Sequence, residues 1–172
     1  MSGPRARVSD FVFVIALAGC SATSQVRPPD PAPTPSVETL EISRRHPGES
    51  LANFALTLQG TPYRYGGATR DGFDCSGLVF YAHRRLGLEV PRTSSDQADE
   101  AEQIKPRKLE PGDLVFFKID SRKVNHVGIY VGSHRFVHAP GAGKPVTVNS
   151  LDDEYYAESF SGAGRYWDRL TQ

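Results

Sequence analysis

The segment "TRDGFDCSGLVFYAHRRLG", Thr69 to Gly87, joins a glycine-containing turn to an amphipathic run. Apolar residues recur in it at helical spacing, at Leu78, Val79, Ala82 and Leu86. A helix that begins near Asp74 places Cys75 in its first turn, where free N–H groups and the helix dipole favour a thiolate. Cys75 is therefore a candidate nucleophile, with a metal ligand and a small buried residue as the alternatives.

Composition bounds what the rest of the chain can be. The 172 residues carry 20 basic and 20 acidic side chains and two cysteines. This length suits one domain with appendages, and the balanced charge argues against electrostatic capture of nucleic acid. No cofactor is implied, and a monomer is the expectation for a domain of this size.

The N-terminus has the pattern of an export signal. Two arginines, Arg5 and Arg7, precede the apolar run Phe11 to Gly19, which is too short to span a bilayer and indicates a secretory signal. "LAGC", Leu17 to Cys20, resembles a bacterial lipobox, in which the cysteine is acylated and becomes the new N-terminus; a plain signal peptide that is cut nearby is the alternative. With Ser21 next, the resemblance implies an outer-membrane lipoprotein anchored at Cys20 and facing the periplasm.

A polar, proline-rich stretch follows and cannot bury a core. It is typical of an extended tether between an anchor and a folded domain. The sequence thus divides into a signal peptide at 1–19, a lipidated cysteine and tether at 20–49, and a folded domain at 50–172.

The folded part begins with helical patterns and ends with strand patterns. Glu49 to Gly60 predicts a helix before the one at Cys75, and Ser94 to Ile104 predicts a short polar helix. After Pro111 five short β-rich runs predict strands, at 113–119, 126–132, 135–139, 146–151 and 165–170. Helices followed by an antiparallel sheet define an α+β domain.

The hairpin of the second and third strands can place two histidines together. A three-residue loop at 132–134 would pair Ile129 with Val137 and put His126 and His138 on one face, because side chains alternate along a strand. A two-residue loop would put them on opposite faces. The shared face makes these histidines candidate partners of Cys75.

Five blocks, "TPYRYGGATRDGFDCSGLVF", "PRTSSDQ", "LEPGDLVFF", "NHVGIYVG" and "RFVHAP", occur in the order seen in NlpC-type cell-wall peptidases. The chain resembles these papain-like cysteine hydrolases from about Leu51 to Leu170 and looks closest to the Spr-like murein endopeptidase lipoproteins. The resemblance implies a papain-like fold with N-terminal helices packed on a central antiparallel sheet. It also implies roles for six residues: nucleophile Cys75, general base His126, orienting His138, oxyanion-binding Tyr63, and Asp74 and Ser76 against a substrate amino group.

The same resemblance implies an activity, the cleavage of peptidoglycan stem peptides at D-alanyl–diaminopimelate cross-links during wall growth. Cleavage of the γ-D-glutamyl–diaminopimelate bond, acyl transfer to an amine, and a non-catalytic wall-binding lipoprotein are the alternatives. Zinc held by Cys75, His126 and His138 is a further one, although closely spaced ligand pairs are missing. Roles for Arg64, Arg70 and Arg92 are not defined by the sequence.

Overall fold

A computed structural model describes residues 47–170. The expected signal peptide, Cys20 and all of the tether up to residue 46 lie outside the described residues. Within the described part, no helix has the length and apolar character that crossing a bilayer requires.

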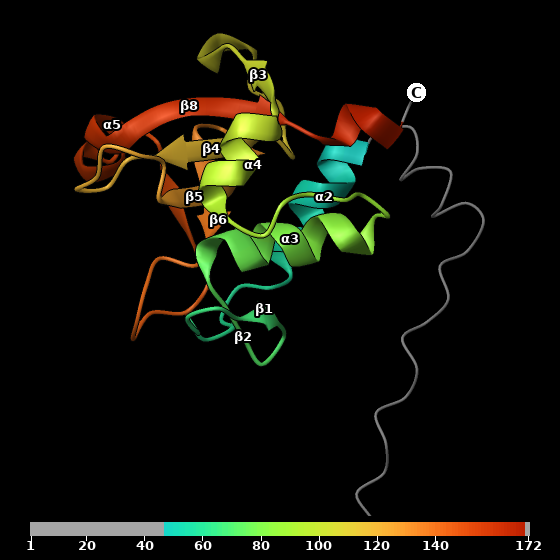
Figure 1. The fold of residues 1–172 in the computed structure, drawn as a ribbon, viewed down its shortest axis with the longest axis vertical. Coiled ribbons are helices and arrows are strands. Elements are labelled where there is room, and N and C mark those ends of the chain that lie inside the picture. Colours follow the sequence, from blue (N-terminus) through green and yellow to red (C-terminus); the bar gives the residue numbers. More distant parts are fainter. Residues whose placement is uncertain (1–46, 171–172) are drawn as a thin grey trace, which may run out of the picture. The chain divides into compact units, whose positions relative to one another are not determined.

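The described chain contains both helices and strands (Figure 1). In order, they are α2 (Pro47–Leu56), β1 (Ala68–Thr69), β2 (Gly72–Phe73), α3 (Cys75–Arg85), α4 (Ser94–Glu100), β3 (Glu102–Ile104), the 3-10 turn η1 (Pro106–Lys108), β4 (Leu114–Phe117), β5 (His126–Gly132), β6 (Arg135–His138), β7 (Thr147–Ser150), α5 (Glu154–Ser159), β8 (Phe160–Arg165) and the 3-10 turn η2 (Trp167–Leu170). Six strands form one antiparallel sheet in the order β3-β8-β4-β5-β6-β7. The predicted α+β class is confirmed.

Helix α3 begins where the sequence predicts. Asp74 is its N-cap, with an extended backbone and a side chain that accepts a 2.6 Å hydrogen bond from the Gly77 N–H. A Cβ atom at Gly77 would overlap the carbonyl oxygen of Gly67, so only glycine lets the β1–β2 segment approach this first turn. The N-terminus of α3 is thereby held against the loop that carries Tyr63.

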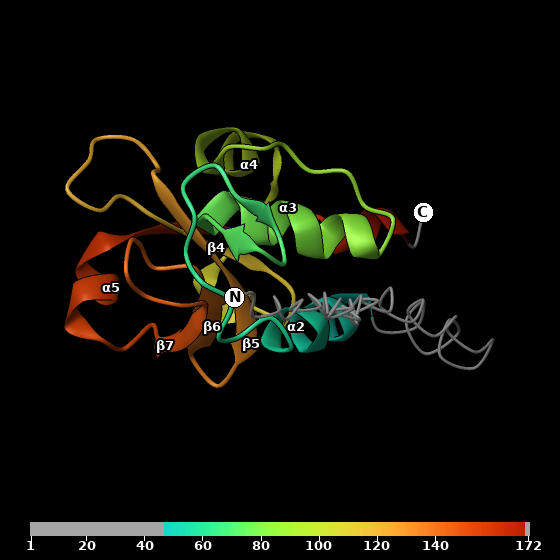
Figure 2. The ribbon, with the colours of Figure 1, turned by 90° about the horizontal axis from the view of Figure 1, so that it is seen from below.

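Both faces of the sheet are covered. Helices α2 and α3 pack against β5 on one face of the sheet (Figure 2). The main core on this face includes the side chains of Leu51, Leu78, Val127, Ile129 and Val137. The opposite face carries a second cluster, formed by Val115, Phe117, Tyr130, Phe136 and Tyr156. Tyr156 comes from α5, a helix that the sequence did not predict. The face that carries the two histidines is therefore covered, not open to solvent.

The β5–β6 hairpin has the predicted register, but its loop and strand differ from the prediction. Ile129 pairs with Val137 as predicted, but Gly132 pairs with Arg135, so the loop has two residues and not three. Ser133 and His134 both have positive φ, 51° and 55°, as a tight hairpin turn requires. Val131 is the extra residue of a β-bulge that restores the alternation and keeps His126 and His138 on one face.

The buried side chain of Asp113 links the start of β4 to the end of β8. Asp113, fully buried before β4, accepts two hydrogen bonds from Arg165 at 2.7 and 2.8 Å. It also accepts a hydrogen bond from Trp167 Nε1 at 3.0 Å and one from the Glu110 N–H at 2.9 Å. All of these bonds depend on the one side chain of Asp113.

Two predicted elements are wrong in the part of the sheet around strand β8. The expected strand at 165–170 is a 3-10 turn, η2, and the strand itself is β8 at Phe160–Arg165. The predicted helix at 94–104 ends at Glu100, and β3 occupies its last residues because they pair with β8.

Candidate active site

The Cys75 side chain lies between the N-terminus of α3 and the start of β5. Its Sγ is half-buried and lies 4.0 Å from the carbonyl oxygen of Asn125, the residue before His126. Within residues 47–170 no hydrogen bond joins Cys75 to His126 directly. The thiol at the start of α3 thus lies beside the residue that precedes His126 on β5.

Three side chains on three adjacent strands form a hydrogen-bonded relay. His126 Nε2 lies 2.7 Å from His138 Nδ1, and His138 Nε2 lies 3.0 Å from Asn149 Oδ1 on β7. The amide oxygen can only accept, so His138 Nε2 carries a proton and His138 Nδ1 accepts from His126 Nε2–H. The lone pair of His126 then lies on Nδ1, the nitrogen free to act as a base.

Sequence reasoning brought His126 and His138 together correctly but missed Asn149 and Tyr156. Asn149 reaches the relay because β7 pairs with β6, with Asn149 opposite Phe136. The Tyr156 hydroxyl lies 3.4 Å from His138 Nε2, close to the same amide. No pattern in the sequence sets the β6–β7 register, so neither residue could be assigned from it.

Burial dominates the electrostatics of the site. It lowers the pKa of His126 to about 3, with His138 adding to the effect, and it lowers the pKa of His138 to about 4 against the Asn149 hydrogen bond. Burial also raises the pKa of the Cys75 thiol, and the Asp74 carboxylate raises it further, although the backbone N–H groups of Val127 and Ser76 oppose this. Burial and Asp74 therefore oppose the thiolate that the helix N-terminus favours, and burial disfavours the charged form of both imidazoles.

Asp74 and Ser76 are engaged within the protein. Five donor atoms contact the Asp74 carboxylate, two from Arg92, one from Ser76 and two from the backbone of Gly66 and Gly77. Burial alone would raise the pKa of Asp74, but the hydrogen bonds from Arg92 and Gly77 lower it overall. Arg92, which had no predicted role, therefore holds the N-cap of the helix that carries Cys75.

Tyr63 lies in the electrostatic range of the thiol. Burial raises the pKa of its phenol, and the neighbouring Cys75 and Asp74 side chains raise it further. A neutral phenol is a hydrogen-bond donor, which is the form that an oxyanion requires. This arrangement is compatible with the predicted role of Tyr63.

A cavity of about 440 Å³ opens beside the relay. His126, Asn149 and Tyr156 line it, together with Lys144 and Asp153 from neighbouring loops. Among residues 47–170 no three His, Cys, Asp or Glu side chains converge in a way that could hold a metal ion.

The buried histidines make folding stability depend on pH. His83, fully buried on α3, has its pKa lowered by burial to about 4, alongside His126 and His138. The unfolded chain binds more protons between about pH 6.5 and 4, so the free energy of unfolding is expected to fall as the pH drops through that window. For His83 alone the loss between pH 7.5 and 5 is about 2 kcal/mol.

Urea unfolding at the two pH values measures this loss. Equal free energies of unfolding at pH 7.5 and 5 would contradict the prediction.

A thiol at a helix N-terminus beside a histidine relay on an antiparallel sheet is the arrangement of papain-like cysteine peptidases. Residues 60–165 match the NlpC/P60 family, and the chain belongs to this family. The family members are cysteine-type peptidases, which confirms the predicted family and enzyme class.

Named relatives agree with this assignment. The chain is 41% identical over 111 residues to the murein DD-endopeptidase MepH of Escherichia coli, covering 62% of this chain and 41% of that protein. It is 39% identical over 157 residues to the probable endopeptidase NlpC of Escherichia coli, covering 90% of this chain and 96% of that protein. The chain thus spans less than half of the first relative and nearly all of the second.

A solved structure shares the fold. The crystal structure of an NlpC/P60 family protein from Bacillus cereus superposes with a TM-score of 0.67 at 31% sequence identity. The match covers 78% of this chain and 41% of that one. The papain-like fold expected from the sequence is confirmed.

Proposed function

We propose that this protein hydrolyses peptidoglycan stem peptides at D-alanyl–diaminopimelate cross-links, with Cys75 as nucleophile, His126 as general base and His138 as its orienting partner. The observation that carries the proposal is the Asn149–His138–His126 relay, because it leaves the His126 Nδ1 lone pair beside the segment that contacts the thiol. The similarity to a murein DD-endopeptidase supports the substrate class.

The reaction follows from these positions. His126 Nδ1 takes the thiol proton as Cys75 Sγ attacks the peptide carbonyl, and the charge that develops on the carbonyl oxygen is stabilised by the Cys75 N–H and the Tyr63 hydroxyl. The protonated His126 gives its proton to the leaving amine, and the acyl group remains on sulfur. Water then gives a proton to His126 and attacks the thioester, which releases the acid and restores the thiol.

The lowered pKa of His126 suits this cycle. A lowered pKa makes His126 a weak base in the free protein, so the proton moves only when the developing oxyanion compensates the charge. His138 and Asn149 then hold the imidazolium by hydrogen bonds along the relay. Proton transfer is thereby coupled to attack on the carbonyl.

The engagement of Asp74 favours a cross-link as the substrate. A carboxylate has about four lone-pair positions, and five donor atoms already contact this one. Little acceptor capacity remains for the free amino group that Asp74 and Ser76 would bind in an amine-anchored enzyme. Cleavage of a bond between two stems does not require Asp74 and Ser76 to bind a free amino group.

Product analysis tests the function. The full-length protein is incubated with cross-linked muropeptide dimers, and the products are identified by mass spectrometry beside a Cys75→Ala variant. Conversion of dimers to tetrapeptide monomers is expected. Fragments that begin at diaminopimelate would instead identify the γ-D-glutamyl bond, and no cleavage would indicate a wall-binding protein.

The proposal extends to the cell surface. The lipobox-like "LAGC" supports cleavage after residue 19, acylation of Cys20 and a periplasm-facing outer-membrane anchor, with 20–49 as tether and a monomeric peptidase domain beyond it. Mass spectrometry of the N-terminal peptide from the expressed protein tests this. An unmodified Cys20, or a different N-terminus, would contradict it.

Asn149→Ala is expected to lower kcat by about ten- to a hundredfold with a smaller change in KM, because His138 loses the acceptor that fixes its tautomer. Asn149→Asp keeps an acceptor oxygen and is expected to retain more activity. The measurement is the pH profile of kcat, which a purely structural role would leave unshifted. Equal activities of the two variants would contradict the tautomer argument.

A further inference from the structure

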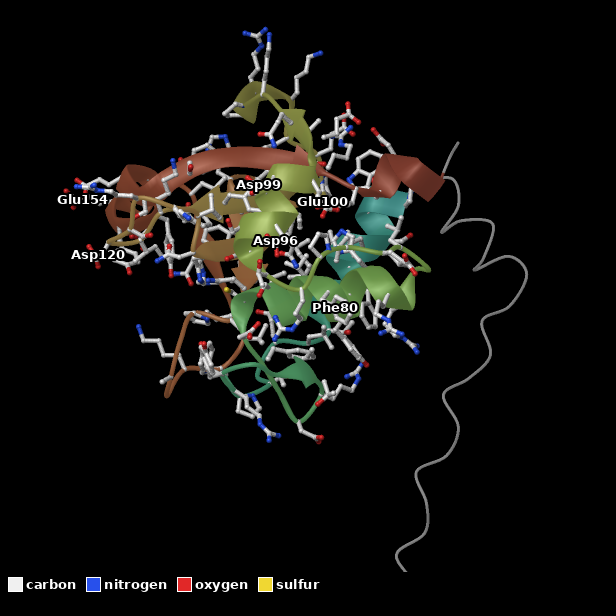
Figure 3. All side chains as sticks on the ribbon, in the orientation of Figure 1. Phe80, Asp96, Asp99, Glu100, Asp120 and Glu154 are labelled. Atoms are coloured by element: carbon white, nitrogen blue, oxygen red, sulfur yellow. The ribbon has the colours of Figure 1, made fainter. Side chains whose placement is uncertain are left out.

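A second cavity lies outside the catalytic relay. It has a volume of about 570 Å³ and lies between α4 and the 118–125 loop that follows β4, over the residues Phe116 and Gly162 of the sheet. Figure 3 labels Asp99 on α4 and Asp120 on that loop. No step of the proposed reaction uses this cavity.

Its polar lining is dominated by cations. Lys118, Arg122 and Lys123 line it, against the single carboxylate of Asp99. All three cationic residues are exposed, and in the described part of the chain none of them forms an ion pair. Three unpaired cations that converge on one groove favour an anionic ligand.

Each wall of the groove includes a residue that is close in sequence to a residue contacting Cys75 or its neighbour Asp74. Val124 lines it, and the next residue, Asn125, has the carbonyl oxygen that lies 4.0 Å from Cys75 Sγ. On the other wall, Ser95 lies in the first turn of α4, shortly after Arg92, which holds Asp74 beside Cys75. An extended peptide advances about 3.3 Å per residue, so a substrate bound at Cys75 can reach the groove within a few residues.

We propose that this cationic groove binds the free carboxylates of one stem peptide of the cross-linked substrate, an inference that rests on the proposed function. A γ-linked glutamate keeps its α-carboxylate, and each stem therefore carries negative charge close to the scissile bond. Lys118, Arg122 and Lys123 bind that charge by charge-assisted hydrogen bonds and select stems whose carboxylates are free.

Paired variants and paired substrates test the groove. The full-length double variant Lys118→Gln with Lys123→Gln is compared with Lys105→Gln with Lys108→Gln, which removes the same charge from exposed residues outside the groove. Each protein is given cross-linked muropeptides with free glutamate α-carboxylates and the same muropeptides with these groups amidated. Turnover gives kcat and KM, and calorimetry with Cys75→Ala added gives Kd.

The groove variant is expected to raise KM and Kd for the free-carboxylate substrate by about three- to tenfold, with kcat changed less than about twofold. The control variant should behave like the unmodified protein. Amidated substrate should bind the unmodified protein about as weakly as the free-carboxylate substrate binds the groove variant, and the variant should show no further loss.

Equal Kd values for the groove variant and the control would overturn the inference. So would an unchanged Kd combined with weaker binding of the variant to phosphatidylglycerol vesicles, which would assign the groove to a membrane surface. If the unmodified protein binds muropeptides but does not cleave them, the proposed function fails, while a carboxylate-dependent Kd would still support the groove.

Discussion

Cys75→Ala is expected to lower kcat/KM for cross-linked muropeptides by at least about a thousandfold, because no other described side chain in the site can form the acyl intermediate. The fold should persist. The thiol is half-buried, and its contact with the Asn125 carbonyl oxygen is long, at 4.0 Å, so its loss leaves a small defect. Muropeptide turnover and the melting temperature measure the two effects separately.

The other cysteine of the chain supplies the control. Cys20→Ser removes a thiol that takes no part in the proposed reaction, so turnover of soluble muropeptides should stay within about twofold of the unmodified protein. Turnover by Cys75→Ala above about one per cent of the unmodified rate would contradict the nucleophile assignment.

Asp113→Ala is expected to lower the free energy of unfolding by about 3–5 kcal/mol, because it leaves the largely buried Arg165 with only the more distant carboxylates of Glu110 and Asp168. The Arg165 side chain is only 11% exposed, and its two short bonds to Asp113 cannot be replaced by water without opening the sheet. The Trp167 indole and the Glu110 N–H lose their acceptor in the same variant. Urea unfolding of the full-length protein measures the change.

A solvent-exposed ion pair is the matched comparison. Asp152 pairs with His134 at 3.0 Å, but the side chains are 71% and 69% exposed. Asp152→Ala should therefore change the free energy of unfolding by less than about 1 kcal/mol. Similar losses in the two variants would show that burial does not set the strength of the Asp113 network.

The elements that the sequence predicted well are those specified by local pattern. Helix α3 has a capping aspartate, an apolar stripe and a terminal glycine, and each of these acts within a few residues. The β5–β6 hairpin alternates cleanly enough to fix the pairing of Ile129 with Val137. The candidate nucleophile and both candidate histidines lie on these two units, so their places in the fold could be predicted from the sequence.

Strand β8 was not predicted from the sequence, because tertiary contacts and not local sequence pattern determine its conformation. "FSGAGR" has no β-branched residue and reads as a turn, yet it lies inside the sheet between β3 and β4. A Cβ atom at Gly164 would overlap the Ala101 side chain and press on Phe116. The small residues are needed for this close packing, and no propensity scale records that need.

Asn149 and the protonation state of the thiol were beyond sequence reasoning for a related reason. The relay depends on the β6–β7 register, which joins segments separated by a loop of irregular sequence. The thiol state depends on how much water reaches Cys75, and that is a property of the packed domain. The strand pattern around the histidines and the helix start at Cys75 were both predicted, but neither pattern includes the contacts that the rest of the domain adds.

The bulge at Val131 has a consequence for how relatives of this chain can be aligned and engineered. Deleting that one residue would leave Gly132 opposite Arg135, Tyr130 opposite Phe136 and Ile129 opposite Val137, so both imidazoles would stay on the same face of the sheet. The number of residues between the two histidines can therefore differ by one between relatives that keep the relay. An alignment of such relatives must preserve the strand pairing and not the length of the segment between the histidines.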